Sequence, residues 1–299
     1  MSVDNSPLTL PSPPPGERIK VRGIVWAKFT RNRLATGSAV VILLLVVLTV
    51  GASWVAPHDP LYIDMGHKFA RPGEAGFLLG ADELGRDVLS RLLHAGRVSL
   101  AVGLVTALIA VLVGSVLGGV AGYYGGAADA FIMRLADVLL SMPTIFLLLA
   151  LSAFLRPSVF SITLIIGLNS WMSVARLVRG QILSLKEQEF VLAARAIGAN
   201  DRRLIFRQLL PNAVPPVLIA ATLTVAMAIL LESSLSYLGY GIQPPTASWG
   251  NMLNNAQTYV LYAPWVAVYP GLMITVTVLS FNFAGDGLRD ALDPRLTLT

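Results

Sequence analysis

Several long stretches of this chain contain no charged residue, and they limit its possible folds more than any other feature. A helix needs about 20 apolar residues to cross about 30 Å of hydrocarbon. Charge-free runs occupy residues 34–57, 98–124, 138–155, 157–175, 208–231 and 233–285. Charged residues make up 13% of the chain, about half of the roughly 25% found in soluble domains. The bilayer is therefore the expected solvent for most of the sequence.

These runs predict an all-α integral membrane protein with six transmembrane helices. We expect the helices near 34–56, 98–122, 135–155, 159–180, 214–238 and 265–285. The predicted organisation is a cytoplasmic tail at 1–33, a first helix with an external loop at 34–97, a five-helix transmembrane domain at 98–287 and a second cytoplasmic tail at 288–299. Residues 1–16 are polar and rich in proline, which is typical of a disordered segment.

Basic residues gather at three places that six helices would put on one side of the membrane. They precede the first helix, follow the last helix and fill the link between the fourth and fifth helices. The loop 239–264, on the opposite side, has no Lys or Arg. Because basic loops stay cytoplasmic, we expect both termini in the cytoplasm.

The segment 187–211 between the fourth and fifth helices predicts a helix–turn–helix outside the membrane. Ala193 and Ala194 favour a helix and add little bulk. Gly198 stands where a helix end takes a left-handed residue, and Asn200 is a suitable N-cap for a second short helix.

The charges and the exit of this segment fit the same picture. Glu189 and Asp201 lie where the first turn of a helix favours acidic side chains. Pro211 is expected to stop or redirect the chain before it re-enters the bilayer.

A segment that only joined two helices could be much shorter. Its alanine face and the arginines around it, Arg203 among them, favour a docking surface for another protein. The alternative is a basic connector that lies on anionic lipid.

The spacing in this segment resembles the EAA loop of bacterial ABC importer permeases. The matching positions are Ala193, Ala194, Gly198, Leu210 and Pro211. Leu192 stands where the family has glutamate, and Gln208 stands where it has an apolar residue. The resemblance implies a type I importer fold in which this loop forms a cytoplasmic coupling helix that docks on an ATPase subunit.

Three further stretches resemble the C-type permeases of the dipeptide, oligopeptide and nickel subfamily. They lie at residues 79–92, at 26–33 before the first helix and at 248–250. The resemblance implies a bacterial inner-membrane subunit that works with a second permease chain, two ATPase subunits and an external substrate-binding protein. Peptides are the expected solute, with nickel or a glutathione-like solute as alternatives.

The sequence offers no catalytic or cofactor site. None of its four lysines follows glycine, so there is no phosphate-binding Gly-Lys-Ser/Thr motif. ATP and magnesium are therefore expected in partner subunits only. There is no cysteine, and His58, His67 and His94 lack a metal-ligand spacing. Nothing in the charge pattern indicates nucleic-acid binding.

A few polar residues lie inside the expected helices. Glu232 is the one carboxylate well within a span, and such a group predicts a functional role. With Asn169, Trp171 and Ser233 it is a candidate for the transport pathway or a gate. Hydrogen bonding between helices is the alternative. An ion-coupled secondary transporter, the rival class, would be expected to carry more intramembrane carboxylates and an internal repeat.

Two more patterns leave alternatives open. Asp82, Glu83, Arg86 and Asp87 could contact an external protein or form ion pairs within their loop. Glycines every four residues, at Gly114, Gly118, Gly122 and Gly126, allow close approach of another helix, from this chain or from a second subunit.

Overall fold

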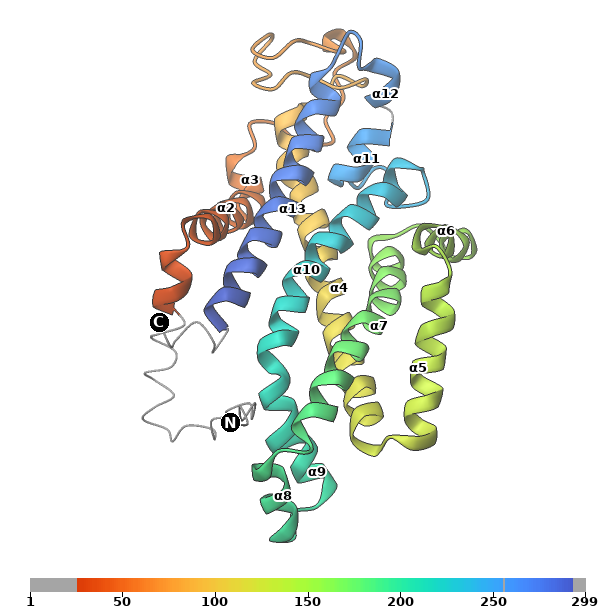
Figure 1. The fold of residues 1–299 in the computed structure, drawn as a ribbon. Helices are drawn as coiled ribbons and strands as arrows, with labels where there is room; N and C mark the ends of the chain where they lie inside the picture. The colour runs from red at the N-terminus through yellow and green to blue at the C-terminus, as the bar shows by residue number, and fades with distance from the viewer. Residues whose placement is uncertain (1–25, 255, 293–299) are drawn as a thin grey trace.

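The computed structural model describes residues 26–254 and 256–292, and all its regular elements there are helices. The expectations for residues 1–16 and for most of the C-terminal tail fall outside this part of the chain. The long helices form an elongated bundle with loops and short helices at both ends (Figure 1). The elements in chain order are α2 Arg33–Val50, α3 Ala52–Val55, η1 Met65–His67, α4 Val88–Tyr124, α5 Gly126–Ser141, α6 Thr144–Phe154, α7 Val159–Leu185, α8 Glu189–Ala196, α9 Asp201–Arg203, the π-helical η2 Leu204–Leu209, α10 Leu210–Tyr237, α11 Trp249–Asn254, α12 Ala256–Tyr259 and α13 Trp265–Leu292.

Five helical runs in the described residues are long and apolar enough to cross a membrane, and α5 with α6 can supply a sixth. The five are α2, α4, α7, the run 201–237 that contains α10, and α13. The prediction of an all-α membrane protein is confirmed. The third predicted helix corresponds to the bent pair α5 and α6.

The helix expected near 135–155 is divided into two helices, α5 and α6. The chain bends by 93° between α5 and α6. Pro143 has no N–H to continue the helix, and Met142 before it is extended with ψ 136°. The helix also starts earlier than expected, because Gly125 and Gly126 turn the chain with φ of 66° and 55° directly after α4.

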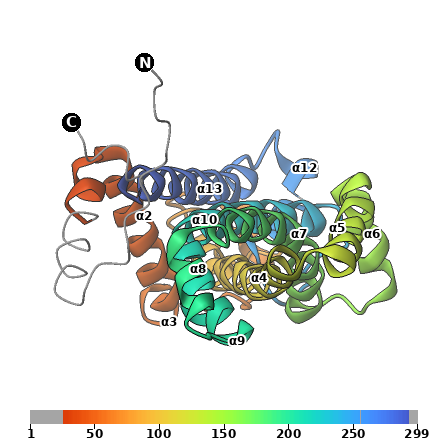
Figure 2. The same cartoon turned by 60° about the horizontal axis from the view of Figure 1, so that its bottom comes forward.

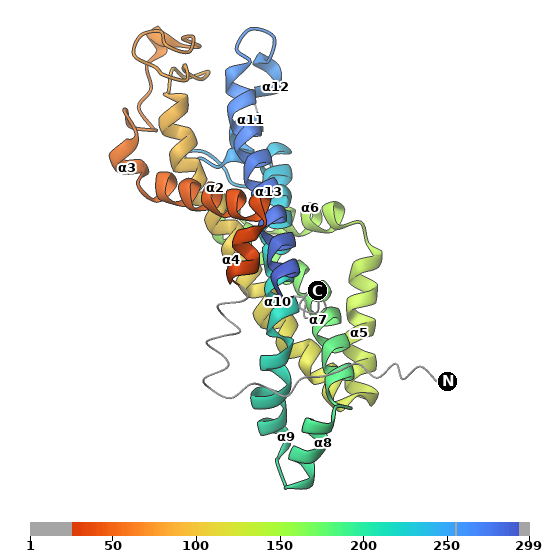
Figure 3. The same ribbon diagram turned by 60° about the vertical axis from the view of Figure 1, so that its left-hand side comes forward.

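Helix α4 is the centre of the bundle and packs most extensively against α7, then against α10. Its expected start at 98 was ten residues late, because α4 begins at Val88 with Asp87 as its N-cap. Figure 2 shows α5 and α6 on one side of the α4, α7 and α10 group and α2 on the other. Helix α2 crosses α13 at a steep angle (Figure 3).

The glycine ladder of α4 serves packing within this chain. A Cβ at Gly114 would lie 2.6 Å from Cβ of Val174 on α7, and one at Gly118 would lie 2.3 Å from the carbonyl oxygen of Ala175. Gly122 faces the backbone of Arg179 in the same way, at 2.9 Å. The ladder therefore brings α4 and α7 together, whereas Gly126 belongs to the turn.

Candidate functional site

The segment 187–211 forms a protrusion at one end of the bundle, with α8 and α9 at its tip (Figures 1 and 3). We call it the 187–211 element. Gly198 has φ +84° and follows α8, and the Asn200 side chain accepts a hydrogen bond from the backbone N–H of Arg203 at 2.9 Å. Both local expectations, the left-handed glycine and the N-cap, are present.

The 187–211 element has one face turned to the bundle and one turned to solvent. Val191, Ala194 and Leu204 are buried in a cluster that includes Val178 and Ile182 of α7. On the other face Ala193 is exposed, and Leu192 and Ile197 are 48% and 85% exposed. The two alanines of the motif thus differ, since Ala194 packs inward and Ala193 faces outward.

Polar contacts fix this element against the end of α4. The hydroxyl of Tyr123 donates to Oδ1 of Asp201 at 2.5 Å, and the Arg195 guanidinium lies 6.0 Å from the centre of the Tyr123 ring. The Lys186 ammonium donates to the carbonyl oxygen of Gly122 at 3.3 Å. Asp201 therefore serves the attachment of the element, although it is exposed, as are Glu189 and Arg203.

The expectation that Pro211 stops the chain was wrong. Leu210 and Pro211 form the first turn of α10, where a missing N–H costs nothing. The helical run from Asp201 to Tyr237 continues through Pro215 and Pro216. The 187–211 element is therefore joined to a transmembrane helix without a loop.

A hollow of about 310 Å³ lies between α7, α10 and the bend that joins α5 to α6. Its polar lining comes from Thr144, Asn169, Ser170, Ser173 and Thr224, and its apolar lining includes Leu223 and Met227. Of the four pathway candidates only Asn169 lies there.

The other three candidates are buried inside the chain. Trp171 is 6% exposed and packs with Ala136 of α5 in a hydrophobic cluster. Ser233 lies against Gly250, whose added Cβ would be 2.5 Å from Cα of Ser233. Glu232 has no exposed surface and accepts hydrogen bonds from serine hydroxyls. None of the three lines the hollow.

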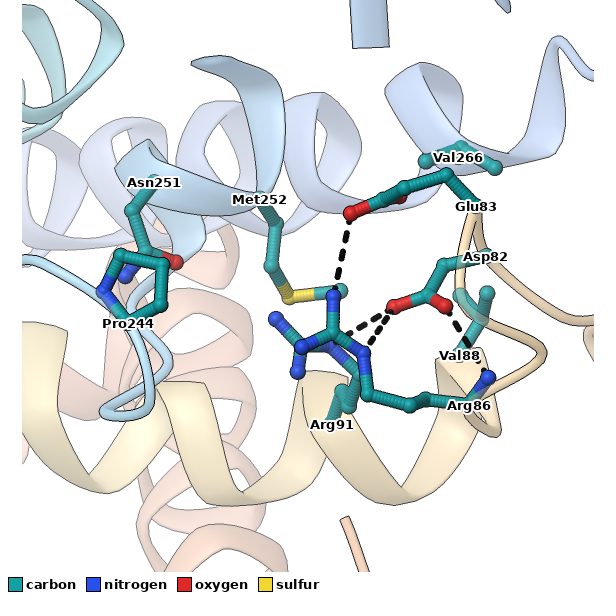
Figure 4. A pocket seen from close by; sticks show the side chains of 9 residues that line it. All are labelled: Asp82, Glu83, Arg86, Val88, Arg91, Pro244, Asn251, Met252 and Val266. Carbon is teal, nitrogen blue, oxygen red and sulfur yellow. Dashed lines mark hydrogen bonds and ion pairs between the residues drawn. The ribbon is translucent and has the colours of Figure 1, made fainter. Parts of the chain in front are cut away.

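The external candidates form a buried ion-pair cluster at the start of α4 (Figure 4). The Arg86 guanidinium donates to Asp82 at 2.7 Å and to Glu83 at 3.0 Å. Asp82 and Arg86 are 3% and 8% exposed. Asp87 is also buried and accepts hydrogen bonds from the N–H and the hydroxyl of Ser90, as the N-cap of α4.

Sequence reasoning did not find Arg91, which completes this cluster. Its Nε lies 3.3 Å from Oδ2 of Asp82, and its guanidinium borders a cavity of about 40 Å³ between α4 and α11 (Figure 4). The charge pattern Asp82-Glu83-x-x-Arg86-x-x-x-x-Arg91 could have indicated it. This cluster holds the loop 56–87 on α4, and Glu83 is its more exposed acidic member.

Two ion pairs between α5 and α7 were also missed. Asp129 pairs with Arg179 at 2.5 and 2.6 Å, and Asp137 pairs with Arg176. Within residues 26–254 and 256–292 no group of three or more His, Asp or Glu side chains could hold a metal ion.

Comparison with known proteins gives two family matches. Residues 114–298 match the family described as binding-protein-dependent transport system inner membrane component. Residues 22–72 match the N-terminal transmembrane domain of oligopeptide transport permease C.

Curated relatives match over nearly the whole chain. The di/tripeptide transport system permease protein DppC of Pseudomonas aeruginosa is 40% identical over 276 residues, with 91% of both chains covered. The glutathione transport system permease protein GsiD of Pectobacterium atrosepticum is 41% identical, with 91% of this chain and 90% of the relative covered. GsiD of Escherichia coli is 42% identical over a similar share.

Two solved structures share the fold. They are inward-facing forms of the MetNI methionine ABC transporter, with TM-scores of 0.53 and 0.55 at 20% and 23% identity. The matches cover 68% and 69% of this chain and 97% and 98% of the solved chains.

Proposed function

The chain belongs to the family of binding-protein-dependent transport system inner membrane components, and on this premise we propose that it conducts short peptides across a bacterial inner membrane. It is a multi-span permease subunit of an ABC importer and not an enzyme. This membership excludes the ion-coupled secondary transporter as a rival. It also implies ATPase and substrate-binding partners.

The hollow between α7, α10 and the α5–α6 bend is the observation that carries the proposal. It combines hydroxyl and amide groups from Asn169, Ser170 and Ser173 with apolar walls. Peptides have the same mixture of hydrogen-bonding and apolar groups. Its volume of about 310 Å³ lies at the lower end of the range of about 300–1,000 Å³ for small-molecule pockets. We propose that it is this chain's share of a pathway that a second, related permease chain completes.

The identity of the solute rests on the relatives. One is named for di- and tripeptides and others for glutathione, which is itself a tripeptide. Both solutes offer a peptide backbone and a terminal carboxylate. Nickel stays an alternative that only the resemblance of residues 79–92 to the dipeptide, oligopeptide and nickel subfamily implies.

The 187–211 element is the proposed docking site for the ATPase. Its outward face carries Ala193 and the exposed side chains of Leu192 and Ile197, while its inward face packs on α7. Apolar side chains that are exposed beyond the transmembrane helices favour contact with a protein partner over contact with water or with lipid headgroups. Leu192, where the family has glutamate, gives this contact an apolar character.

The assembly we propose has two permease chains, two ATPase subunits that bind ATP and magnesium, and an external binding protein that delivers the solute. Both termini lie on the ATPase side. The division into a tail at 1–33, a first helix and external loop at 34–97, a core at 98–287 and a tail at 288–299 belongs to this proposal. Glu83 is the member of the external cluster best placed to contact the binding protein.

The test uses the native bacterium with the gene deleted and then restored. Deletion is expected to abolish uptake of radiolabelled di- or tripeptide, and the wild-type gene should restore it. Restoration with Asn169→Leu, which replaces the amide in the hollow, should lower uptake several-fold at equal membrane abundance. Parallel uptake of labelled glutathione and nickel identifies the solute. Unchanged uptake of all three in the deletion strain would contradict the proposal.

A further inference from the structure

Glu232 is the centre of a hydrogen-bonded joint between three parts of the chain. Its Oε1 accepts from the hydroxyls of Ser236 and Ser248, each at 2.7 Å. Its Oε2 accepts from the hydroxyl of Ser99 at 3.3 Å. Ser236 belongs to α10, Ser99 to α4 and Ser248 to the segment 239–254 that follows α10. We call this set the Glu232 clasp.

Each serine of the clasp also accepts a backbone N–H from the segment 239–254. The N–H of Ile242 donates to Ser236, that of Trp249 to Ser99 and that of Asn251 to Ser248, at 3.0–3.1 Å. A backbone N–H cannot accept a hydrogen bond, so each hydroxyl is free to give its own proton to Glu232. The carboxylate thus receives three donors and holds three backbone positions of one segment.

Close backbone contacts fix the same segment. A Cβ at Gly250 would lie 2.5 Å from Cα of Ser233, and a Cβ at Gly241 would lie 2.4 Å from the nitrogen of Ser236. Trp249 is fully buried, and its indole N–H donates to the carbonyl oxygen of Leu92 on α4 at 3.0 Å. The segment 239–254 is therefore packed against the C-terminal end of α10 and the N-terminal part of α4.

The other end of α10 is the 187–211 element. From Leu210 to Glu232 the helix rises about 33 Å at 1.5 Å per residue. The helical run that reaches the clasp begins at Asp201, so only the short turn 197–200 separates it from α8, which carries the proposed docking surface. A displacement of the element is thus transmitted along one helix.

We propose that the Glu232 clasp couples the 187–211 element to the external segment 239–254, so that Glu232 is a positioning residue for the opening and closing of the external side. The proposal rests on the docking function proposed for the element. A carboxylate suits this role because it accepts from all three serines, whereas an amide in its place turns one donor toward Ser99.

The experiment reconstitutes the complete transporter in proteoliposomes and measures solute transported per ATP hydrolysed. Ser248→Ala removes one of the three hydrogen bonds that Glu232 receives, and we expect a several-fold lower ratio. Glu232→Ala should lower the ratio further, and Glu232→Gln should lie between wild type and Glu232→Ala. The matched control is Ser234→Ala, since Ser234 is exposed on the same helix and donates only to the Leu230 carbonyl.

The outcomes separate coupling from folding. Uncoupling predicts that ATP hydrolysis continues in assembled complexes and loses its dependence on the external binding protein. An unchanged ratio in Ser248→Ala, or equal losses of hydrolysis and transport in Ser248→Ala and Glu232→Ala, would overturn the clasp proposal. Normal ATPase docking and hydrolysis in Ala193→Trp, a variant of the 187–211 element with the clasp intact, would instead overturn the proposed docking function. If Glu232→Ala does not assemble, Ser248→Ala alone decides the question.

Discussion

Gly118→Ala tests the close approach of α4 and α7 directly. The added Cβ would lie 2.3 Å from the carbonyl oxygen of Ala175, about 1 Å short of ordinary contact, and 2.9 Å from its Cα. Both atoms are backbone, so relief requires a shift of α7 as a whole. Overpacking of this kind costs about 1–3 kcal/mol, and the better helix propensity of alanine returns about 1 kcal/mol at most.

The matched control is one residue away. A Cβ at Gly119 would lie 3.6 Å from the Leu210 side chain, which is ordinary contact, so Gly119→Ala is expected to be neutral or slightly stabilising. The assay is the thermal melting of the detergent-solubilised transporter, where Gly118→Ala should melt a few degrees lower than wild type. Equal melting of wild type and Gly118→Ala would refute the packing role of the ladder, as would greater damage from Gly119→Ala.

Three other changes test the ends of the bundle. Asp82→Asn leaves the Arg86 guanidinium buried without its nearest carboxylate, at a cost of about 3–5 kcal/mol. Proteolysis within residues 56–87 should therefore be faster in spheroplasts that carry this variant. An unchanged digestion rate would count against a structural ion pair. Asn200→Ala removes the N-cap of α9 at a cost of about 1 kcal/mol, and hydrogen exchange of the Arg203 amide should accelerate. Gly198→Ala forces a side chain to φ +84° at a cost of about 1–2 kcal/mol, although no neighbouring atom lies within 4 Å of the added Cβ. ATPase stimulation should therefore fall in Gly198→Ala, and Gly198→Asn should retain more of it. Equal effects of the two substitutions would contradict the backbone explanation.

Features that depend on neighbouring residues were predictable from the sequence. The left-handed Gly198 and the cap at Asn200 follow from backbone sterics and a side chain three residues from its partner. The long apolar runs likewise gave the membrane class and the approximate helix positions. The four-residue glycine spacing predicted a close helix contact and left its partner open.

Features that depend on distant contacts were not predictable. Asp129 lies in a helix that was expected to start later, and its charge is offset by Arg179, 50 residues away. Glu232 was identified as unusual, but its partners Ser99 and Ser248 lie 133 and 16 residues from it. Its role changed from a pathway candidate to a buried joint only once these contacts were known. The helix expected near 135–155 was placed from its apolar run alone, and the proline at 143, where the chain bends, was not considered.

The most direct test of the proposed coupling places a bulky side chain on the exposed face of α8. Ala193→Trp leaves the inward packing of Ala194 untouched, and Leu78→Trp, at an exposed position of the loop that precedes α4, is the control. The measurement is transport together with ATP hydrolysis by the assembled transporter in proteoliposomes. We predict that Ala193→Trp inserts normally and loses both transport and stimulated hydrolysis, while Leu78→Trp retains stimulated hydrolysis. Wild-type transport and hydrolysis in Ala193→Trp would contradict the assignment of the 187–211 element as the ATPase docking site.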